Sequence, residues 1–168
     1  MWAKSKSIFF IFTLISSLTA APPSLHVYVI PFDNIKNDVA IAWLSDAFSE
    51  MVNASLSQHD RIYLKDKTGL EEVMSNRSLL LQQRPGTKNL LVLGKFERAL
   101  DKISVAVQLI DISSWEELDS RKVRGEYNDI TGINRSLSET INTMLVPFLP
   151  KIETVSYTHL TLPTKRIV

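Results

Sequence analysis

The amino-acid sequence predicts an α/β fold, with a mixed sheet of about five strands flanked by three helices in the order β-α-β-α-β-β-β-α. Three patterns support this prediction: a strand-forming apolar run at residues 25–31, apolar residues at three- and four-residue steps after residue 38, and strict alternation through residues 103–109. The chain has 168 residues, of which 45% are hydrophobic and 22% charged, enough apolar material for one core. We therefore expect a single domain.

The first strand is expected at residues 25–31, and Pro31 ends its ladder because proline has no amide hydrogen to donate. Asp38 is the expected N-cap of the first helix. The apolar stripe of this helix consists of Ile41, Leu44, Phe48, Met51 or Val52, and Leu56. Residues 61–64 form the second expected strand, so the chain begins with a β-α-β unit whose strands are parallel.

A second helix is expected to begin at Thr68, because Thr68 and Glu71 form a capping-box pattern. Its apolar side would consist of Leu70, Val73, Met74, Leu80 and Leu81. The next run, residues 89–96, is apolar at both even and odd positions as far as Gly94. This pattern is typical of a central strand that is covered on both faces.

A hairpin turn at residues 99–102 leads into the clearest strand of the sequence. Its core face is expected to carry Ile103, Val105, Val107 and Leu109. After a second turn at residues 113–117, the chain returns as an edge strand whose basic residues discourage pairing with other chains. Leu118 is out of phase with Val123 and Tyr127, which predicts a β-bulge in this strand.

The last helix is expected at residues 131–148, where prolines 147 and 150 end it. Its apolar stripe consists of Ile133, Leu137, Ile141, Leu145 and Phe148. We therefore assign residues 22–150 to the single α/β domain.

Both ends of the chain lie outside the predicted domain. Residues 1–21 have two lysines, an apolar run too short to cross a bilayer, and small residues at their end, which is the pattern of a secretory signal peptide cleaved near Ala20 or Ala21. Residues 151–168 have no amphipathic period, and from about residue 155 the sequence VSYTHLTLPT resembles a translated sequencing adapter. We expect the natural reading frame to have been cut near Thr154.

The charge of the domain argues against nucleic-acid binding. Residues 1–20 and 155–168 carry four basic residues and no acidic ones, so the 19 basic and 18 acidic residues of the chain become 15 and 18 in residues 21–154. A weakly acidic domain without a basic stripe is a poor partner for nucleic acid. No integral membrane span is expected after signal cleavage. The sequence has no cysteine, which fits an exported bacterial domain in the periplasm that needs no disulfide.

No catalytic, cofactor-binding or metal-binding constellation is visible in the sequence. The loop at residues 32–38 lacks the glycines of a phosphate-binding turn and the spacing of a calcium loop, so we interpret its polar residues as turn and capping residues. The histidines are isolated, and the paired carboxylates Asp46 and Glu50 suit a solvated helix face. We expect Trp43 to be a core residue, whereas Trp115 is equally compatible with a partner contact.

Four short motifs resemble the TolB amino-terminal-domain-like family, which includes FlgO-like periplasmic domains. VIPFDN resembles the family's strand ending in PF-x-N, WLSD its helix start, LLVLGKF its strand ending in glycine, and QLIDISSWE its QLID-x-x-TG-E hairpin. The resemblance covers about residues 25–148. The sequence departs from the family pattern at residues 113–117, where Ser-Ser-Trp replaces the Thr-Gly turn. The family-motif or possible partner-contact residues are Pro31, Phe32, Asn34, Trp43, Asp46, Gly94, Asp111 and Trp115.

The resemblance implies an exported, non-enzymatic domain of the bacterial cell envelope that docks partner proteins or an envelope assembly. The alternative is the N-terminal sensor or regulatory domain of a larger enzyme or repeat protein. The partner, the oligomeric state, an association with the outer membrane and a small ligand at residues 32–38 stay open at this point.

Overall fold

A computed structural model describes residues 24–149 of the chain. One sheet holds all strands in the order β3-β1-β4-β5-β6, and a short β2 pairs with β4 beside this path. The strands are β1 (Leu25–Val29), β2 (Asp33–Asn34), β3 (Ile62–Lys65), β4 (Lys88–Ala99), β5 (Lys102–Asp111) and β6 (Glu116–Glu126). The helices are η1 (Val39–Ile41), α1 (Leu44–Leu56), α2 (Lys67–Ser75), α3 (Ser78–Leu81), α4 (Ile130–Leu145) and η2 (Val146–Phe148).

The sheet is mixed, as the sequence predicts. β1 pairs in parallel with β3 on one side and with β4 on the other, whereas β4, β5 and β6 form an antiparallel meander. The predicted β-α-β start and the element order are therefore confirmed. The sheet differs by the additional two-residue strand β2, which forms because the chain after β1 runs on beside β4.

The prediction of one continuous second helix is wrong. The structure has two helices, α2 and α3, separated at Asn76, whose backbone leaves the helical region at φ −134° and ψ 83°. The N-cap is Asp66, whose side chain accepts a hydrogen bond from the Gly69 amide, and not Thr68. Met74 and Leu81, which the single-helix pattern placed on the apolar side, are 54% and 87% exposed.

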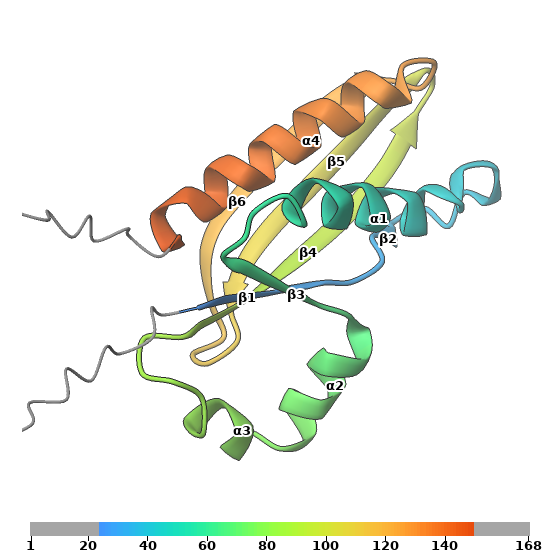
Figure 1. The fold of residues 1–168 in the computed structure, drawn as a ribbon. Coiled ribbons are helices and arrows are strands. Elements are labelled where there is room, and N and C mark those ends of the chain that lie inside the picture. Colours follow the sequence, from blue (N-terminus) through green and yellow to red (C-terminus); the bar gives the residue numbers. More distant parts are fainter. Residues whose placement is uncertain (1–23, 150–168) are drawn as a thin grey trace, which may run out of the picture.

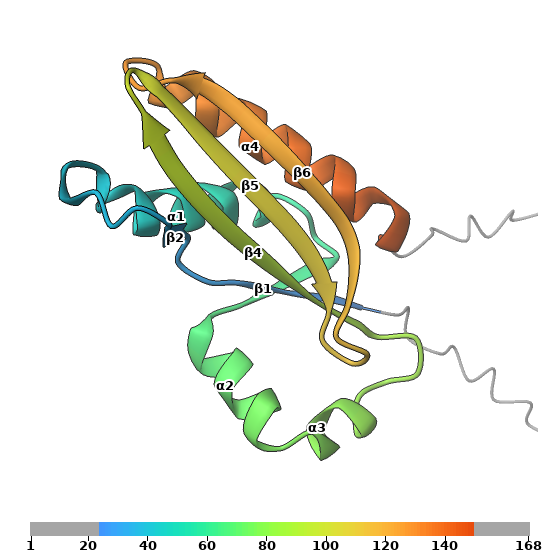
Figure 2. The same cartoon turned by 180° about the vertical axis from the view of Figure 1, so that it is seen from behind.

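The helices cover the two faces of the sheet unequally. α1 and α4 lie together on one face, and α2 and α3 lie on the other beside β1 and β3 (Figure 1). Seen from behind, no helix of residues 24–149 lies above most of the outer surface of β4, β5 and β6 (Figure 2). The larger core cluster therefore forms under α1 and α4, and a smaller cluster forms under α2 around Tyr28, Leu70, Val73, Leu91 and Ile112.

The central strand β4 contributes to both clusters. Leu90, Val92 and Phe96 point into the larger cluster, and Leu91 points into the smaller one. The prediction of a strand covered on two faces therefore holds for the first half of β4, at residues 90–92, and not for the second half, whose outer face carries the exposed Lys95. In β5 the burial alternates residue by residue, and the predicted core face is buried throughout.

The predicted β-bulge lies in the edge strand β6. The β5–β6 register shifts between Leu109 and Ile110, which pair with Asp119 and Glu117, so Leu118 has no partner across the ladder. Leu118 is partly buried against the larger core cluster. The extra residue thus brings Leu118 to the same core cluster as Val123 and Tyr127, with which it is out of phase in the sequence.

Two predictions on the chain ends fall outside the described residues, namely the signal peptide at 1–21 and the tail from 151. Among residues 24–149, no helix has the length and apolar character needed to cross a bilayer.

Candidate functional site

The motif residues at the end of β1 form a structural joint. Phe32 is 1% exposed and packs beside Phe48, with ring centroids 5.9 Å apart. A Cβ atom at Gly94 would lie 2.2 Å from Cδ2 of Phe32, so only glycine lets the ring lie on β4. The backbone of Phe32 exchanges two hydrogen bonds with Ser45, because its amide donates to the Ser45 carbonyl and its carbonyl accepts from Oγ of Ser45. The joint fixes the start of α1 on the sheet.

The polar residues after Phe32 are occupied by turns and caps. Nδ2 of Asn34 donates to the Asp38 carbonyl at 2.9 Å, and Oδ1 of Asn34 accepts from the Asp38 amide at 3.3 Å. Oδ1 of Asp38 in turn accepts from the Ala40 amide at 3.0 Å and caps η1. Asn34 and Asp38 are thus turn and capping residues as predicted, but Asp38 caps η1 and not the first α-helix, because α1 begins only after Trp43. Within residues 24–149, no three histidines or acidic residues gather in a way that would hold a metal ion.

The same connection presents an apolar surface to solvent, which we call the 35–43 segment. Ile35 is 49% exposed, Val39 88% and Trp43 53%. The prediction that Trp43 is a core residue is wrong, because the buried positions of this turn are taken by Ile41 and Leu44. Val39 begins the 3-10 helix η1, and Trp43 is the residue directly before α1.

Carboxylates flank the 35–43 segment. Asp33 precedes it, and Asp46 follows it in the first turn of α1, where a negative charge suits the helix dipole. Both are exposed. The basic residue of the segment, Lys36, is engaged with the body of the protein through an ion pair with Glu97 at 3.2 Å and a hydrogen bond to the Arg98 carbonyl. The exposed surface is therefore apolar with an acidic margin.

The motif residue Asp111 organises the turn between β5 and β6. Its side chain accepts a hydrogen bond from the Ser113 amide at 2.8 Å and pairs with Lys88 at 3.6 Å. Its carbonyl accepts from the Trp115 amide at 2.7 Å. Trp115 has a φ of 60°, in the left-handed region that favours glycine, and is 45% exposed. The hairpin therefore keeps the backbone geometry for which the family pattern uses glycine.

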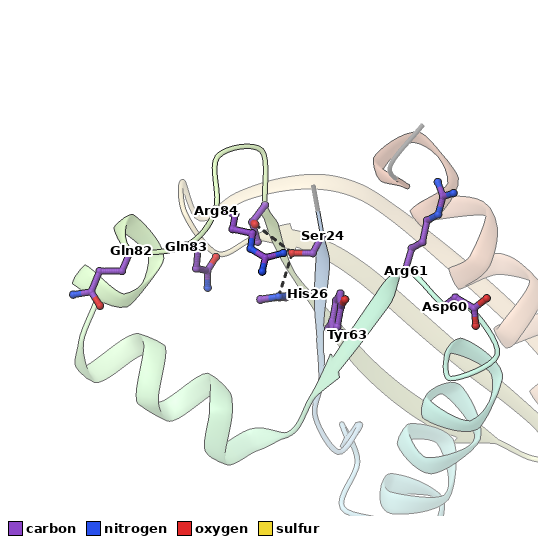
Figure 3. Close-up of a pocket in the computed structure, with 9 residues that line it drawn as sticks. Ser24, His26, Asp60, Arg61, Tyr63, Gln82, Gln83 and Arg84 are labelled. Carbon is purple, nitrogen blue, oxygen red and sulfur yellow. Dashed lines mark hydrogen bonds between the residues drawn. The ribbon is translucent and has the colours of Figure 1, made fainter. Parts of the chain in front are cut away.

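A polar hollow lies at the opposite end of β1, and we call it the Arg84 hollow. Its volume is about 530 Å³, and Figure 3 shows its walls. It is bounded by the start of β1, the start of β3 and the connection from α3 to β4. The lining residues are Ser24, His26, Asp60, Arg61, Tyr63, Gln82, Gln83, Arg84 and Thr87.

His26 forms the floor of this hollow and separates it from a smaller one of about 240 Å³. Its ring meets Tyr63 edge to face, with centroids 5.5 Å apart. Burial, and then the positive charge of Lys65, lower the pKa of His26 below 6.5. The Asn89 side chain raises the pKa and so opposes this shift, although it makes no hydrogen bond of good geometry to Nδ1 of His26. This Nδ1 atom is shielded from solvent and lacks a hydrogen-bond partner among residues 24–149.

The polar groups beneath the hollow are tied to the sheet. Asn89 is 2% exposed, donates to Oε1 of Gln83 at 2.6 Å and accepts from Nε2 of Gln83 at 3.3 Å. The Tyr28 hydroxyl also reaches Asn89 at 3.5 Å, and burial raises the pKa of Tyr28. This network holds the end of the α3–β4 connection in place.

Sequence reasoning missed the Arg84 hollow for a physical reason. The sequence directs attention to the carboxyl end of the first strand, at residues 32–38, because parallel sheets commonly bind ligands at that end. The hollow instead lies at the amino end of β1, and its walls come from three segments that are distant in sequence. None of these segments carries a motif, so no local pattern indicated the hollow.

Comparisons with known proteins support the fold. No model of a known protein family matches the chain, and no curated protein sequence matches it. Among solved structures, it is similar to TolB from Acinetobacter baumannii, with 16% identity and a TM-score of 0.51 over 77% of this chain and 30% of that one. The structure thus has a TolB amino-terminal-domain-like fold, in agreement with the resemblance seen in the sequence.

Two further similarities are weaker. A PelC dodecamer from Paraburkholderia phytofirmans has 16% identity and a TM-score of 0.45, over 77% of this chain and 96% of that one. The C-terminal domain of LpoB from Salmonella enterica has 12% identity and a TM-score of 0.40, over 64% and 86%.

Proposed function

We propose that this protein is an exported, non-enzymatic domain of the bacterial cell envelope that docks a partner protein through the 35–43 segment. The observation that carries the proposal is the exposure of Val39 and Trp43 beside a joint that holds the segment rigidly on the sheet. A tryptophan side chain on a fixed backbone is typical of a binding hot spot.

The charge around the segment defines the partner. Asp33 and Asp46 are exposed at its margin, and the ammonium group of Lys36 is engaged by Glu97. We expect the partner to present an apolar contact with basic residues around it, because complementary charges steer association and fix its register. The signal-peptide pattern and the absence of cysteine support the periplasm as the place where this happens.

A photo-crosslinking experiment tests the docking surface. A photoreactive amino acid at position 39 is compared with the same residue at position 81, because Val39 and Leu81 are 88% and 87% exposed on different parts of the fold. The full chain is expressed with its export signal in its own host. We expect one defined protein adduct from position 39 and none from position 81. Equal adducts at both positions, or none at position 39, would contradict the proposal.

The affinity for the captured partner provides the second measurement. Trp43→Ala is expected to weaken binding of the purified partner roughly 30-fold, the effect of a hot-spot residue of about 2 kcal/mol. Leu81→Ala is the matched control, because it removes an equally exposed apolar side chain elsewhere. Unchanged binding by Trp43→Ala, with an unchanged melting temperature, would show that the segment is not the contact.

One observation favours a second function, that of an N-terminal sensor or regulatory domain within a longer protein. The chain spans 30% of the TolB chain that it matches, so the same fold occurs as part of a longer polypeptide. The sequence of the gene beyond the codon for Thr154 distinguishes the two functions. A stop codon directly after this position excludes the second one, and a continuing frame that encodes another domain favours it.

A further inference from the structure

We propose that the Arg84 hollow binds a carboxylate group, presented either by a small organic acid or by the C-terminal end of a peptide. This inference goes beyond docking through the 35–43 segment, because the hollow lies at the other end of β1 and uses none of the residues of that segment.

The cationic group of the site is Arg84. Its side chain is exposed at the rim, and its guanidinium makes no hydrogen bond or ion pair with the other residues in the 24–149 range. Arg61 lines the same hollow but already has an interaction partner, so Arg84 is the cation that remains for a ligand. A guanidinium is always charged at physiological pH and has a planar fork of donors that matches the two oxygens of a carboxylate.

Two hydroxyl groups stand beside Arg84. Oγ of Ser24 and Oγ1 of Thr87 lie 3.2 Å apart, and the Thr87 amide donates to the Arg84 carbonyl in the turn between residues 84 and 87. A hydrogen bond between two hydroxyls uses one of their two protons, so the second proton is free to turn toward a bound oxygen. Oγ of Ser24 is also 3.5 Å from Nε2 of His26, which is a long and weak contact.

His26 adds a polar atom beneath these hydroxyls. Its Nδ1 is shielded from solvent and has no hydrogen-bond partner in the described part of the chain. A ligand in the hollow therefore does not reach Nδ1, and the polar atom that His26 offers beside the hydroxyls is Nε2, 3.5 Å from Oγ of Ser24. His26 therefore supplies a polar floor on which a ligand atom can rest.

The site is built on the sheet, which holds its groups in place before a ligand arrives. The Ser24 carbonyl accepts from the Lys88 amide at 3.0 Å, which anchors the start of β1 to β4. Gln83 is fixed through its two hydrogen bonds with Asn89, directly before Arg84 in the chain. Preorganised donors bind an anion more tightly than flexible ones because less ordering is needed on binding.

The hollow is polarised along its length. Arg84, Ser24 and His26 are grouped at one end, whereas Asp60 and Arg61 lie at the other (Figure 3). The carboxylate of Asp60 repels a second acid group, so the acid of the ligand belongs at the Arg84 end. Tyr63 is 55% exposed and offers a ring to the remainder of the ligand. The volume of about 530 Å³ suits a small molecule or the last residues of a peptide.

Calorimetric titration of the full chain with three probes tests the proposal. The probes are butyrate, which has a single carboxylate, the tripeptide Ala-Ala-Ala with a free C-terminal carboxylate, and the same tripeptide with an amidated C-terminus. We expect at least one of the two acids to bind and the amidated peptide not to bind. Binding of butyrate alone identifies a small acid as the ligand class, and binding of the free tripeptide alone identifies a peptide end.

Two arginine variants separate this site from general charge effects. Arg84→Gln is expected to weaken binding of the acid about tenfold or more, because it removes a charge-assisted hydrogen bond. Arg135→Gln makes the same charge change at an exposed position on α4, over the opposite face of the sheet, and is expected to leave binding unchanged. The melting temperature of each variant verifies that it is folded.

Three results would overturn the proposal. They are the absence of binding by both acids at millimolar concentration, equal binding of the amidated and free tripeptides, and an Arg84→Gln variant that binds as tightly as the parent. None of them affects docking through the 35–43 segment, because the crosslinking and Trp43→Ala experiments read a different surface.

Discussion

Replacing Gly94 by alanine tests the joint between β1, α1 and β4. The new Cβ would lie 2.2 Å from Cδ2 and 2.3 Å from Cε2 and Cγ of Phe32. Carbon atoms in contact are normally about 3.5–4.0 Å apart, so the Phe32 ring has to retreat by roughly 1.3 Å or more. Phe32 is 1% exposed, and its ring packs beside Phe48. The ring of Phe48 in turn packs against Phe96, with ring centroids 5.6 Å apart. No open space is therefore available on the side of these rings.

The expected loss of stability follows from this overlap. Overpacking of a core costs about 1–3 kcal/mol, and the backbone constraint of alanine in the unfolded chain returns roughly 0.5 kcal/mol. We therefore expect Gly94→Ala to lower the free energy of unfolding by about 2 kcal/mol. For a domain of this size the melting temperature falls by roughly 6–10 °C. Urea denaturation followed by far-UV circular dichroism measures the change.

Two further variants make this prediction specific. Gly69→Ala is the matched control, because its Cβ would be 3.5 Å from the nearest atom, an ordinary contact inside α2. We expect it to raise the free energy of unfolding by about 0.5 kcal/mol. Combining Gly94→Ala with Phe32→Leu should cost at least about 1 kcal/mol less than the two changes added separately, because the smaller side chain makes room. A Gly94→Ala protein within 0.5 kcal/mol of the parent, or strict additivity of the pair, would refute the reasoning.

The remaining predictions concern the hairpin tip and the hollow. Leu100 has a φ of 56° and is 90% exposed, so Leu100→Asn is expected to raise the free energy of unfolding by roughly 0.5–1 kcal/mol, measured by the same urea titration; a less stable variant would contradict this. Because burial and Lys65 lower the pKa of His26, the unfolded chain binds more protons than the folded chain between the folded pKa and 6.5, and stability falls as the pH drops through that window. His26→Gln should therefore reduce the loss of unfolding free energy between pH 7.5 and 5.5, and an unchanged pH dependence would count against the assignment.

Local sequence patterns predicted most elements because each pattern matches the environment in which the element lies. The alternating residues of β5 match the burial of a strand with one face on the core. The out-of-phase position of Leu118 in the sequence corresponds to the β-bulge in β6. The apolar pattern failed to predict the ends of the second helix, where polar side chains compete for backbone hydrogen bonds. Asp66 caps α2 in place of Thr68, and the break at Asn76 depends on local backbone geometry that an apolar period does not report.

The exposure of Trp43 also shows where the apolar periodicity of a helix fails to predict burial. Trp43 lies one residue before α1, and a shift of one position on a helix turns a side chain from the core to the solvent. The apolar surface of the 35–43 segment is evident only in the structure, where Ile41 and Leu44 take the buried positions.

The sequence by itself determined the class of the fold, the order of its main elements and the faces of the sheet that meet the core, because periodicity is a local property of the chain. Only the tertiary structure decided that Phe32 rests on Gly94, that α2 and α3 are separate helices, and that Ser24, His26 and Arg84 meet around one hollow. These contacts join residues that are far apart along the chain. Their formation depends on the register and packing of the whole sheet, which no single stretch of sequence contains.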